Sequence, residues 1–322
     1  MRKGCVVAIV LIGVLAMGTI ADAGPKISAS VDGVRGFGYT SYIVPEFRTT
    51  ERLERERKFP LDVFVTRLNV GVEGAFSGGT PWRLLIDIGK SVNDPGDLME
   101  DTGWVIGDVG DHSAKYLDVE SGVELGVWLI DISGRMVFYR RPGFRLEGVL
   151  GYGYRTLSYE AFGAEGWLFD PGIEFSEDEA LKAHDYEVTY HMPYVGMGAR
   201  MLLMQTLTID TELSYSPRTS AKDRHDDHVM HFKTSESDCS GKTIIIALDT
   251  IWAPHRGGSG LNWFVGIGTE INYTTTEGDQ TQIWFGDDLF TEEDDTGRRE
   301  PNIFAEIKSS TQSIYLRFGA EL

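Results

Sequence analysis

Apolar and polar residues alternate along about ten stretches of this chain, and the last stretch ends at the final residue. Successive side chains of a β-strand point to opposite faces, so an alternation with period two predicts a strand with one apolar face. In the C-terminal stretch, Ile314, Leu316 and Phe318 share one face, while Tyr315 and Arg317 lie on the other. The predicted strands lie at 27–41, 64–72, 82–88, 117–129, 143–161, 195–203, 207–215, 242–253, 261–271 and 314–322.

The connections between these strands are alternately short and long. Short or turn-rich connections lie at 77–81, 131–143, 204–206 and 253–260, and long charged ones at 42–60, 93–113, 163–184, 218–240 and 278–303. Membrane barrels have short periplasmic turns and long external loops, which places both termini in the periplasm and requires an even number of strands. The sequence therefore predicts an all-β fold, a closed ten-stranded antiparallel transmembrane β-barrel with long extracellular loops. Several strands exceed the ~9–11 residues of a membrane crossing, so the barrel is expected to extend beyond the bilayer.

A soluble β-sandwich is the alternative fold, because its strands also alternate apolar and polar faces. Long loops at every second connection favour the barrel over the sandwich. A closed barrel cannot be divided, so we expect a single domain.

The N-terminus has the features of a secretory signal peptide. Met1-Arg2-Lys3 supplies positive charge, an apolar run covers 6–20, and Ala21-Asp22-Ala23 forms a small-x-small cleavage site. We predict a signal peptide at 1–23 and one barrel domain at 24–322. No second apolar run approaches the ~18–20 residues of a membrane helix, so the mature chain would cross a membrane as strands.

The composition restricts the class of partner. The formal net charge is −19 and charged residues make up 25% of the chain. This acidity disfavours nucleic acid and favours cationic partners. Cys5 is removed with the leader, so Cys239 stays unpaired and no disulfide framework is expected. We interpret Cys239 as an exposed thiol.

The fourth long connection contains the densest set of candidate catalytic side chains. Three histidines and three aspartates lie between 223 and 231. Asp226 and His228 are two residues apart, so on an extended segment they share a face, where a carboxylate can orient an imidazole as a general base. Asp223 and His225 have the same spacing. The alternatives are a polar loop with incidental histidines, or adventitious metal binding.

Two other acidic segments carry weaker signals. The second long connection includes Asp101 near Trp104, which by itself is typical of a solvated acidic loop. The run at 287–295 lacks the glycine and the alternation of a Ca²⁺-binding loop, so we interpret it as solvated. We predict neither a cofactor nor a resident metal ion.

Several motifs together resemble the omptins, a family of ten-stranded outer-membrane proteases. The segment 190–196 (Tyr-His-Met-Pro-Tyr-Val-Gly) is similar to the family's M-P-Y-[IL]-G strand. Tyr215-Ser216, followed by the segment 226–228 (Asp-Asp-His), is similar to the D-E-H motif, and 99–104 (Met-Glu-Asp-Thr-Gly-Trp) resembles M-x-D-x-D-W. Gly151-Tyr152 with Ser158-Tyr159 is similar to another family block. The order of these motifs agrees with the predicted topology.

The resemblance implies a protease in which an Asp–His dyad activates water and an Asp–Asp couple faces it across an external cleft. His228 would be the base and Asp226 its orienting carboxylate. Asp101 takes the first position of the couple, and Gly103 occupies the second, where the family has aspartate. One half of the couple is therefore missing from this chain.

Other family features are also reduced. A W-T-D-x-S-x-H-P-x-T block is represented only by Asp108 and His112. Thr156 and Thr189 lie where lipopolysaccharide-binding arginines would be expected. Lipopolysaccharide is therefore a partner only by resemblance.

These observations predict an omptin-like endopeptidase of the bacterial outer membrane, monomeric, with its active face extracellular. It would cleave cationic peptides or proteins with a water activated by Asp226 and His228, and Asp101 would assist. The first alternative is a catalytically impaired barrel that acts as an adhesin or a structural protein, which Gly103 favours. A lipid hydrolase would need a lipid-facing Ser–His pair, and no histidine lies in such a position; a pore is disfavoured because ten strands leave little lumen.

Overall fold

The computed structural model describes residues 25–48, 51–106, 112–168, 173–178, 180–229, 231–254, 261–287 and 294–322. The predicted leader lies outside these residues. The described strands are β1 (Lys26–Arg48), β2 (Glu51–Pro60), β3 (Phe64–Ala75), β4 (Pro81–Ser91), β5 (Met99–Ile106), β6 (His112–Arg141), β7 (Phe144–Leu168), β8 (Ile173–Ser176), β9 (Lys182–Met204), β10 (Leu207–Asp227), β11 (Lys233–Trp252), β12 (Asn262–Trp284) and β13 (Arg299–Glu321). No helix in these ranges is long and apolar enough to cross a membrane.

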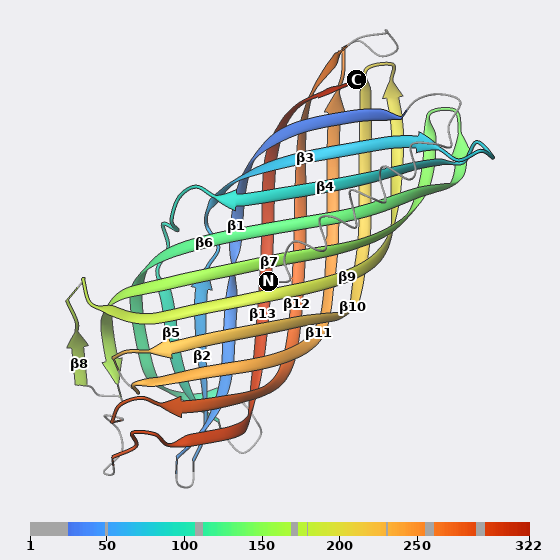
Figure 1. Cartoon of the computed structure of the whole chain (residues 1–322). Helices are drawn as coiled ribbons and strands as arrows, with labels where there is room; N and C mark the ends of the chain where they lie inside the picture. Colours follow the sequence, from blue (N-terminus) through green and yellow to red (C-terminus); the bar gives the residue numbers. More distant parts are fainter. Residues whose placement is uncertain are drawn as a thin grey trace.

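The strands form one antiparallel sheet that closes on itself (Figure 1). Starting from β1, the ladder runs through β3, β4, β6, β7, β9, β10, β11, β12 and β13, and β13 pairs with β1 again. β2 and β5 continue the wall where β3 and β4 end, because β1 pairs next with β2, β2 with β5, and β5 with β6. The predicted ten-stranded antiparallel barrel is confirmed.

The barrel has two halves of opposite polarity. We call the part that contains Lys26 and Glu321 the terminal half, and the part that contains β2 and β5 the distal half. In the terminal half, apolar side chains point outward: Leu150 and Phe318 are 68% and 65% exposed. This outward apolar belt marks the membrane-spanning region, since a bilayer requires apolar side chains on the outer face of the wall.

In the distal half, the alternation has the opposite orientation, with apolar side chains inside and polar ones outside. Leu157, Tyr186 and Ile307 point inward and are buried, while acidic side chains such as Glu100 and Glu236 point outward. The outer face meets water there, so charged residues are stable on it and the apolar residues fill the lumen.

The segments predicted as long loops are therefore mostly strand. β1 runs on to Arg48, β10 to Asp227 and β12 to Trp284. The charged residues that indicated loops are the solvated outer face of these extended strands. The expectation that the barrel extends beyond the bilayer agrees with β6, which is 30 residues long against the ~9–11 of one crossing.

Aromatic rings fill the distal lumen. Phe59 of β2 stacks on Tyr186 of β9 with ring centroids 4.6 Å apart, and lies 4.8 Å from Tyr159 of β7. Along the inward face of β2, Leu53, Arg55, Arg57 and Phe59 follow one another. Leu53 belongs to a second apolar cluster, with Leu117, Val119, Ala164 and Ala183. Two charged residues of β2 thus lie between two apolar layers.

Cys239 does not have the predicted exposure. It is fully buried in the main core, and its Sγ lies 3.8 Å from the carbonyl oxygen of Ala305. The prediction was wrong because it treated 218–240 as a loop, whereas Cys239 lies on an inward position of β11 opposite Ala221.

Candidate active site

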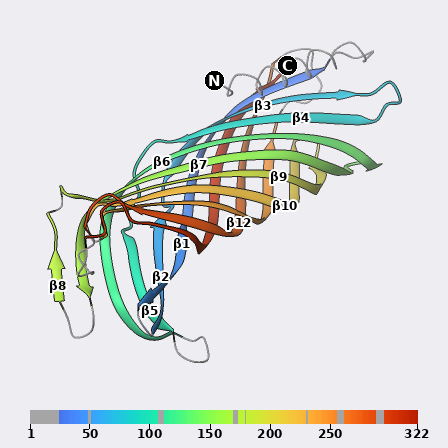
Figure 2. The ribbon, with the colours of Figure 1, turned by 60° about the horizontal axis from the view of Figure 1, so that its bottom comes forward.

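A buried set of ionic side chains lies across the distal lumen, and we call it the distal ionic cluster. Its members are Arg55, Arg57, Asp101, His184, Asp227 and His231. They come from β2, β5, β9, the end of β10 and the connection between β10 and β11, so side chains distant in sequence meet in the distal half. Figure 2 shows β2 and β5 side by side in this half.

Arg55 and Asp101 form the strongest contact in the cluster. The Arg55 Nε donates to Asp101 Oδ1 at 2.7 Å, and Arg55 Nη2 donates to Oδ2 at 2.5 Å. This two-point geometry matches a guanidinium to both oxygens of a carboxylate. The third nitrogen, Nη1, lies 2.6 Å from His231 Nε2, so we assign that imidazole nitrogen as an acceptor. Arg55 and Asp101 are 2% and 1% exposed, so neither side chain is open to bulk solvent.

Arg57 connects the two acids of the cluster. Its Nε donates to Asp101 Oδ2 at 3.2 Å, and its Nη2 donates to Asp227 Oδ2 at 3.4 Å. The other oxygen of Asp227 accepts the backbone N–H groups of Val229 and His231, each at 3.3 Å. The chain that follows β10 is thereby fixed to the inward carboxylate.

The arginines keep both acids ionised in spite of burial. Burial alone would raise the pKa of Asp101, but the charges of Arg55 and Arg57 outweigh it and lower that pKa to about 2. Burial opposes ionisation of Asp227 too, yet the neighbouring histidines and arginines hold its pKa well below the usual range. Because both carboxylates are neutralised by cations, neither is a free proton acceptor at neutral pH.

Burial has the opposite consequence for the histidines. It lowers the pKa of His184 to about 4, although Asp227 lies 4.0 Å away and favours the charged form. His225, whose ring stacks on that of His184 at 5.2 Å, has a pKa well below the usual range because burial and Arg57 disfavour its protonation. Both imidazoles are thus neutral at pH 7.

The residues predicted as a dyad bond to other partners. Asp226 accepts hydrogen bonds from Thr234 Oγ1 at 2.6 Å and from Arg224 Nε at 3.1 Å. His228 Nε2 lies 2.9 Å from Asp185 Oδ2, and both side chains are about one-third exposed. Asp226 and Asp227 are successive residues of one strand, so Asp226 lies on the face opposite the cluster that contains Asp101.

A β-bulge in β10 sets this orientation. Before it, Asp210, Ser214 and Ser216 occupy the inward positions; after it, Asp223, His225 and Asp227 do. The register with both neighbouring strands shifts between Tyr215 and Ser220. An extra residue at a bulge reverses which residues of a strand face inward. The bulge therefore turns Asp227 inward in place of Asp226.

Gly103 lies beside a bulky ring. A Cβ placed on Gly103 would overlap the ring of Tyr116, which is buried against β5. The position that the family pattern assigns to a second aspartate is thus taken up by an aromatic side chain.

The sequence contains a pattern that indicates the two arginines of the cluster. In Arg55-Glu56-Arg57 the two basic residues are two apart and share a face if the segment is a strand. The prediction of a long loop at 42–60 is wrong here, because the segment is strand β2 with both arginines on its inward face.

The remaining sequence candidates have ordinary surroundings or lie outside the described residues. The hydroxyls of Thr156 and Thr189 are 3.2 Å apart on β7 and β9, a neutral pair. Asp108 falls outside the described residues, as does the side chain of His112.

Comparison with known proteins identifies the family. The sequence matches the model of the omptin family over residues 75–249, more than half of the chain. The fold is similar to the outer membrane protease OmpT from Escherichia coli, with a TM-score of 0.69 and 13% identity over 92% of this chain and 97% of that one. The translocator domain of the autotransporter NalP from Neisseria meningitidis is 10% identical over 97% and 93% of the two chains, with a TM-score of 0.39. No curated protein sequence matches.

The chain therefore belongs to the omptin family, a family of outer-membrane proteases. It is a β-barrel of the bacterial outer membrane, as the alternation and the connection lengths predicted.

Proposed function

We propose that this protein is a catalytically impaired omptin-family barrel that acts at the cell surface as a structural or adhesive protein. The observation that carries the proposal is the engagement of Asp101 by Arg55 through both carboxylate oxygens. A carboxylate that helps to activate water needs an oxygen free to accept a proton or to bind the water.

The distal ionic cluster offers no such oxygen on Asp101. Arg57 adds a third bond to the carboxylate, and the side chains of Arg55, Arg57 and Asp101 are all less than 5% exposed. Asp227 is likewise bound by Arg57 and by two backbone N–H groups. These ion pairs connect strands on different parts of the barrel wall. A hydrolase would need a solvated cleft at the same place.

Gly103 supports the same proposal. The missing aspartate removes one carboxylate of the couple, and the Tyr116 ring fills its space. Loss of one member of a general-base system lowers rates by typically ~10²–10⁴-fold.

An active endopeptidase is the second candidate, and one observation favours it. His228 and Asp185 form an imidazole–carboxylate pair at 2.9 Å that is partly open to solvent. Such a pair can orient an imidazole as a base. In this alternative Asp185 takes the orienting role predicted for Asp226. Cationic peptides would be its substrates, since many acidic side chains cover the distal outer wall.

Peptide hydrolysis by the purified protein tests the proposal. The protein is refolded in detergent with and without lipopolysaccharide and given a dibasic and an acidic fluorogenic peptide at low salt. We expect no turnover above buffer. Turnover that His228→Ala abolishes and Lys222→Ala, an exposed control on β10, leaves unchanged would overturn the proposal and establish the endopeptidase.

A further inference from the structure

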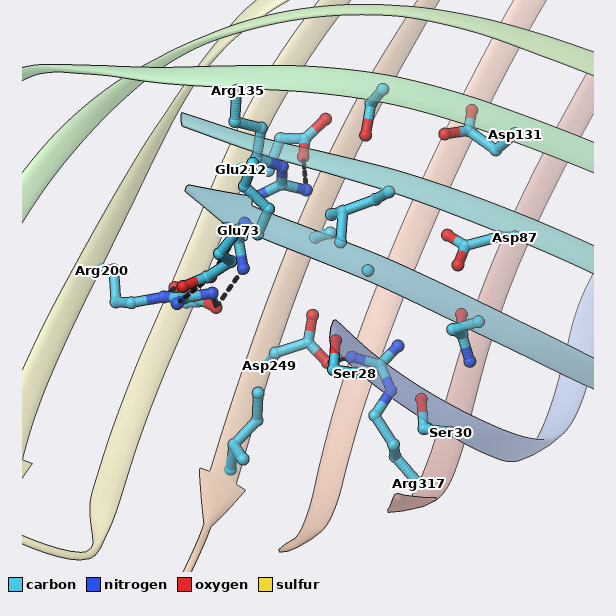
Figure 3. A pocket seen from close by; sticks show the side chains of 18 of the residues that line it. Ser28, Ser30, Glu73, Asp87, Asp131, Arg135, Arg200, Glu212, Asp249 and Arg317 are labelled. Atoms are coloured by element: carbon cyan, nitrogen blue, oxygen red, sulfur yellow. Dashed lines mark hydrogen bonds and ion pairs between the residues drawn. The ribbon is translucent and has the colours of Figure 1, made fainter. Parts of the chain in front are cut away.

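A cavity of about 1130 Å³ occupies the terminal half of the barrel (Figure 3). Lys26, Glu321 and Leu322 line one part of it, so it reaches the rim where the chain ends lie. Asp87, Asp131 and Arg155 line another part, deeper along the strands. The cavity is separate from the distal ionic cluster, so a ligand bound in it is independent of the proposed function.

Arginines neutralise nearly all the acidic side chains of this lumen. Asp210 is bonded by Arg200 at 2.5 Å, and Glu147 by Arg83 at 3.0 Å. Among the described residues, the acids of this lumen with an arginine partner are Asp32, Glu73, Glu147, Asp210, Glu212, Asp249 and Glu270. The pattern is what burial of charge demands, because an unpaired carboxylate in a restricted space is costly.

Asp87 and Asp131 depart from this pattern. Neither forms an ion pair with a basic side chain in the described part of the chain, and Asp131 accepts a hydrogen bond from Tyr194 Oη at 2.7 Å. They are also direct cross-strand partners on β4 and β6. Figure 3 shows both carboxylates pointing into the same space. Like charges directly opposite each other on neighbouring strands repel, so this pair requires a compensating positive charge.

The neighbouring position on β3 carries a further oxygen donor. Asn69 is the cross-strand partner of Asp87, and it lines the same cavity. Its side chain is nine-tenths buried, and neither its amide oxygen nor its amide nitrogen has a hydrogen-bond partner. A buried amide with both ends free is rare and indicates a ligand or water at that point.

One transverse row of the wall therefore presents oxygens into the cavity. Ser30 of β1, Asn69 of β3, Asp87 of β4 and Asp131 of β6 are successive cross-strand partners. Next in the row, Gly153 of β7 has no side chain, and the Asp131 carboxylate and the Met192 side chain lie around the position that a Cβ would take. Adjacent strands are ~4.8 Å apart, so donors on β3, β4 and β6 can reach one ion.

The nearest arginines are already engaged. Arg67 binds Asp32 at 2.9 Å and Glu270 at 3.3 Å, and Arg317 binds Asp32 at 2.8 Å and Asp249 at 3.3 Å. Neither contributes a bond to Asp87. Among the described residues, no basic side chain bonds to the aspartate pair, so a bound cation or a shared proton is needed to offset the repulsion between the two carboxylates.

We propose that Asp87 and Asp131, with the amide oxygen of Asn69, bind a hard divalent cation of the Ca²⁺ class in the barrel lumen. Two carboxylates and neutral oxygens are the donors such an ion takes, and the cavity leaves room for coordinating waters. The described residues hold no group of three or more histidine, cysteine or acidic side chains arranged for a metal ion. The ion is therefore bound by two carboxylates, water and neutral oxygens, which is typical of weak sites.

Calcium titration tests the site directly. The full-length mature protein is refolded into detergent free of lipopolysaccharide, treated with EDTA and dialysed. Isothermal calorimetry with CaCl₂ is expected to show one saturable site, and calcium is expected to raise the temperature of barrel unfolding. Asp87→Asn/Asp131→Asn should lose both effects. In EDTA, that variant should unfold at a temperature no lower than that of the native protein, because the substitutions remove the repulsion between the two carboxylates.

The matched control is Glu236→Gln/Asp238→Asn, which removes two charges from exposed positions on β11. It should bind calcium as the native protein does. Asn69→Ala, which keeps both carboxylates, should weaken binding without loss of the fold, and it serves if the double variant does not refold. No saturable binding by the native protein would overturn the proposal, because a proton shared by the two aspartates would then suffice. Equal binding by the native protein and by Asp87→Asn/Asp131→Asn would overturn it as well.

Discussion

The guanidinium of Arg55 binds both oxygens of Asp101 between two apolar layers of the distal lumen. This relationship joins β2 to β5 and, through Arg57 and Asp227, to β10 on another part of the wall. It places the acid that the family pattern assigns to catalysis in a structural contact.

Removal of Arg55 is expected to destabilise the barrel. Arg55→Ala leaves the Asp101 charge buried with fewer partners, which costs about 3–5 kcal/mol for pairs of this kind. Lys58→Ala is the control on the same strand, since Lys58 makes an exposed pair with Glu100 and should change stability by less than about 1 kcal/mol. Urea unfolding in detergent, followed by the gel shift of the folded barrel, measures both. If Arg55→Ala and Lys58→Ala lower the free energy of unfolding by the same small amount, the distal ionic cluster does not stabilise the barrel.

Stability is expected to fall in two steps as the pH is lowered. The pKa of His184 is about 4 when folded, against an ordinary 6.5, so the unfolded chain binds a proton first and stability falls between about pH 6.5 and 4. The pKa of Asp101 is about 2 when folded, against 3.8, so its contribution is lost between about pH 4 and 2.

His184→Asn should reduce the first step, to which His225 also contributes because burial lowers its pKa, and should leave the second. Each step is expected to amount to at most about 3 kcal/mol. The measurement is the urea midpoint as a function of pH. An equal pH dependence of the native protein and of His184→Asn between pH 6.5 and 4 would show that His184 is not held neutral by burial.

Gly103→Asp alone should not produce a protease. The new Cβ would overlap the Tyr116 ring, and such overpacking costs about 1–3 kcal/mol. Gly103→Asp/Tyr116→Ala should relieve the overlap and recover part of the stability. Unfolding midpoints and peptide hydrolysis of the two variants provide the check. A stable and active Gly103→Asp protein would show that the ring moves freely.

Any slow hydrolysis by the native protein is expected to depend on Asp185 more than on Asp226. His228 is hydrogen-bonded to Asp185, whereas Asp226 is bonded to Thr234 and Arg224. Asp185→Asn should therefore lower a residual rate by about 10²-fold or more, and Asp226→Asn should change it little. The hydrolysis rates of both variants are measured at several pH values. A larger loss of rate in Asp226→Asn than in Asp185→Asn would support the dyad predicted from the family pattern.

The sequence alone determined the class of fold. The period-two alternation in segments such as Ile314, Leu316 and Phe318 follows from local geometry, because a strand allows only two faces and a bilayer requires one of them to be apolar. Residues 190–196 and 99–104 carried the family resemblance. The sequence also located the acidic position at Asp101, which the structure places in the distal ionic cluster.

Only the tertiary structure decided the partners of Asp101. Alternation assigns a residue to one of two faces but gives no distance across the barrel, so the approach of Arg55 and Asp227 depends on how the ring closes. Between Ser216 and Thr219, the bulge in β10 exchanges the residues that face inward with those that face outward. A pattern of period two cannot be extended through such an insertion. Arg55 and Arg57 lie in a segment predicted as a loop, because its charged residues are typical of loops. In the distal half, water lies outside the wall, so charged residues are stable on the outer face of a strand.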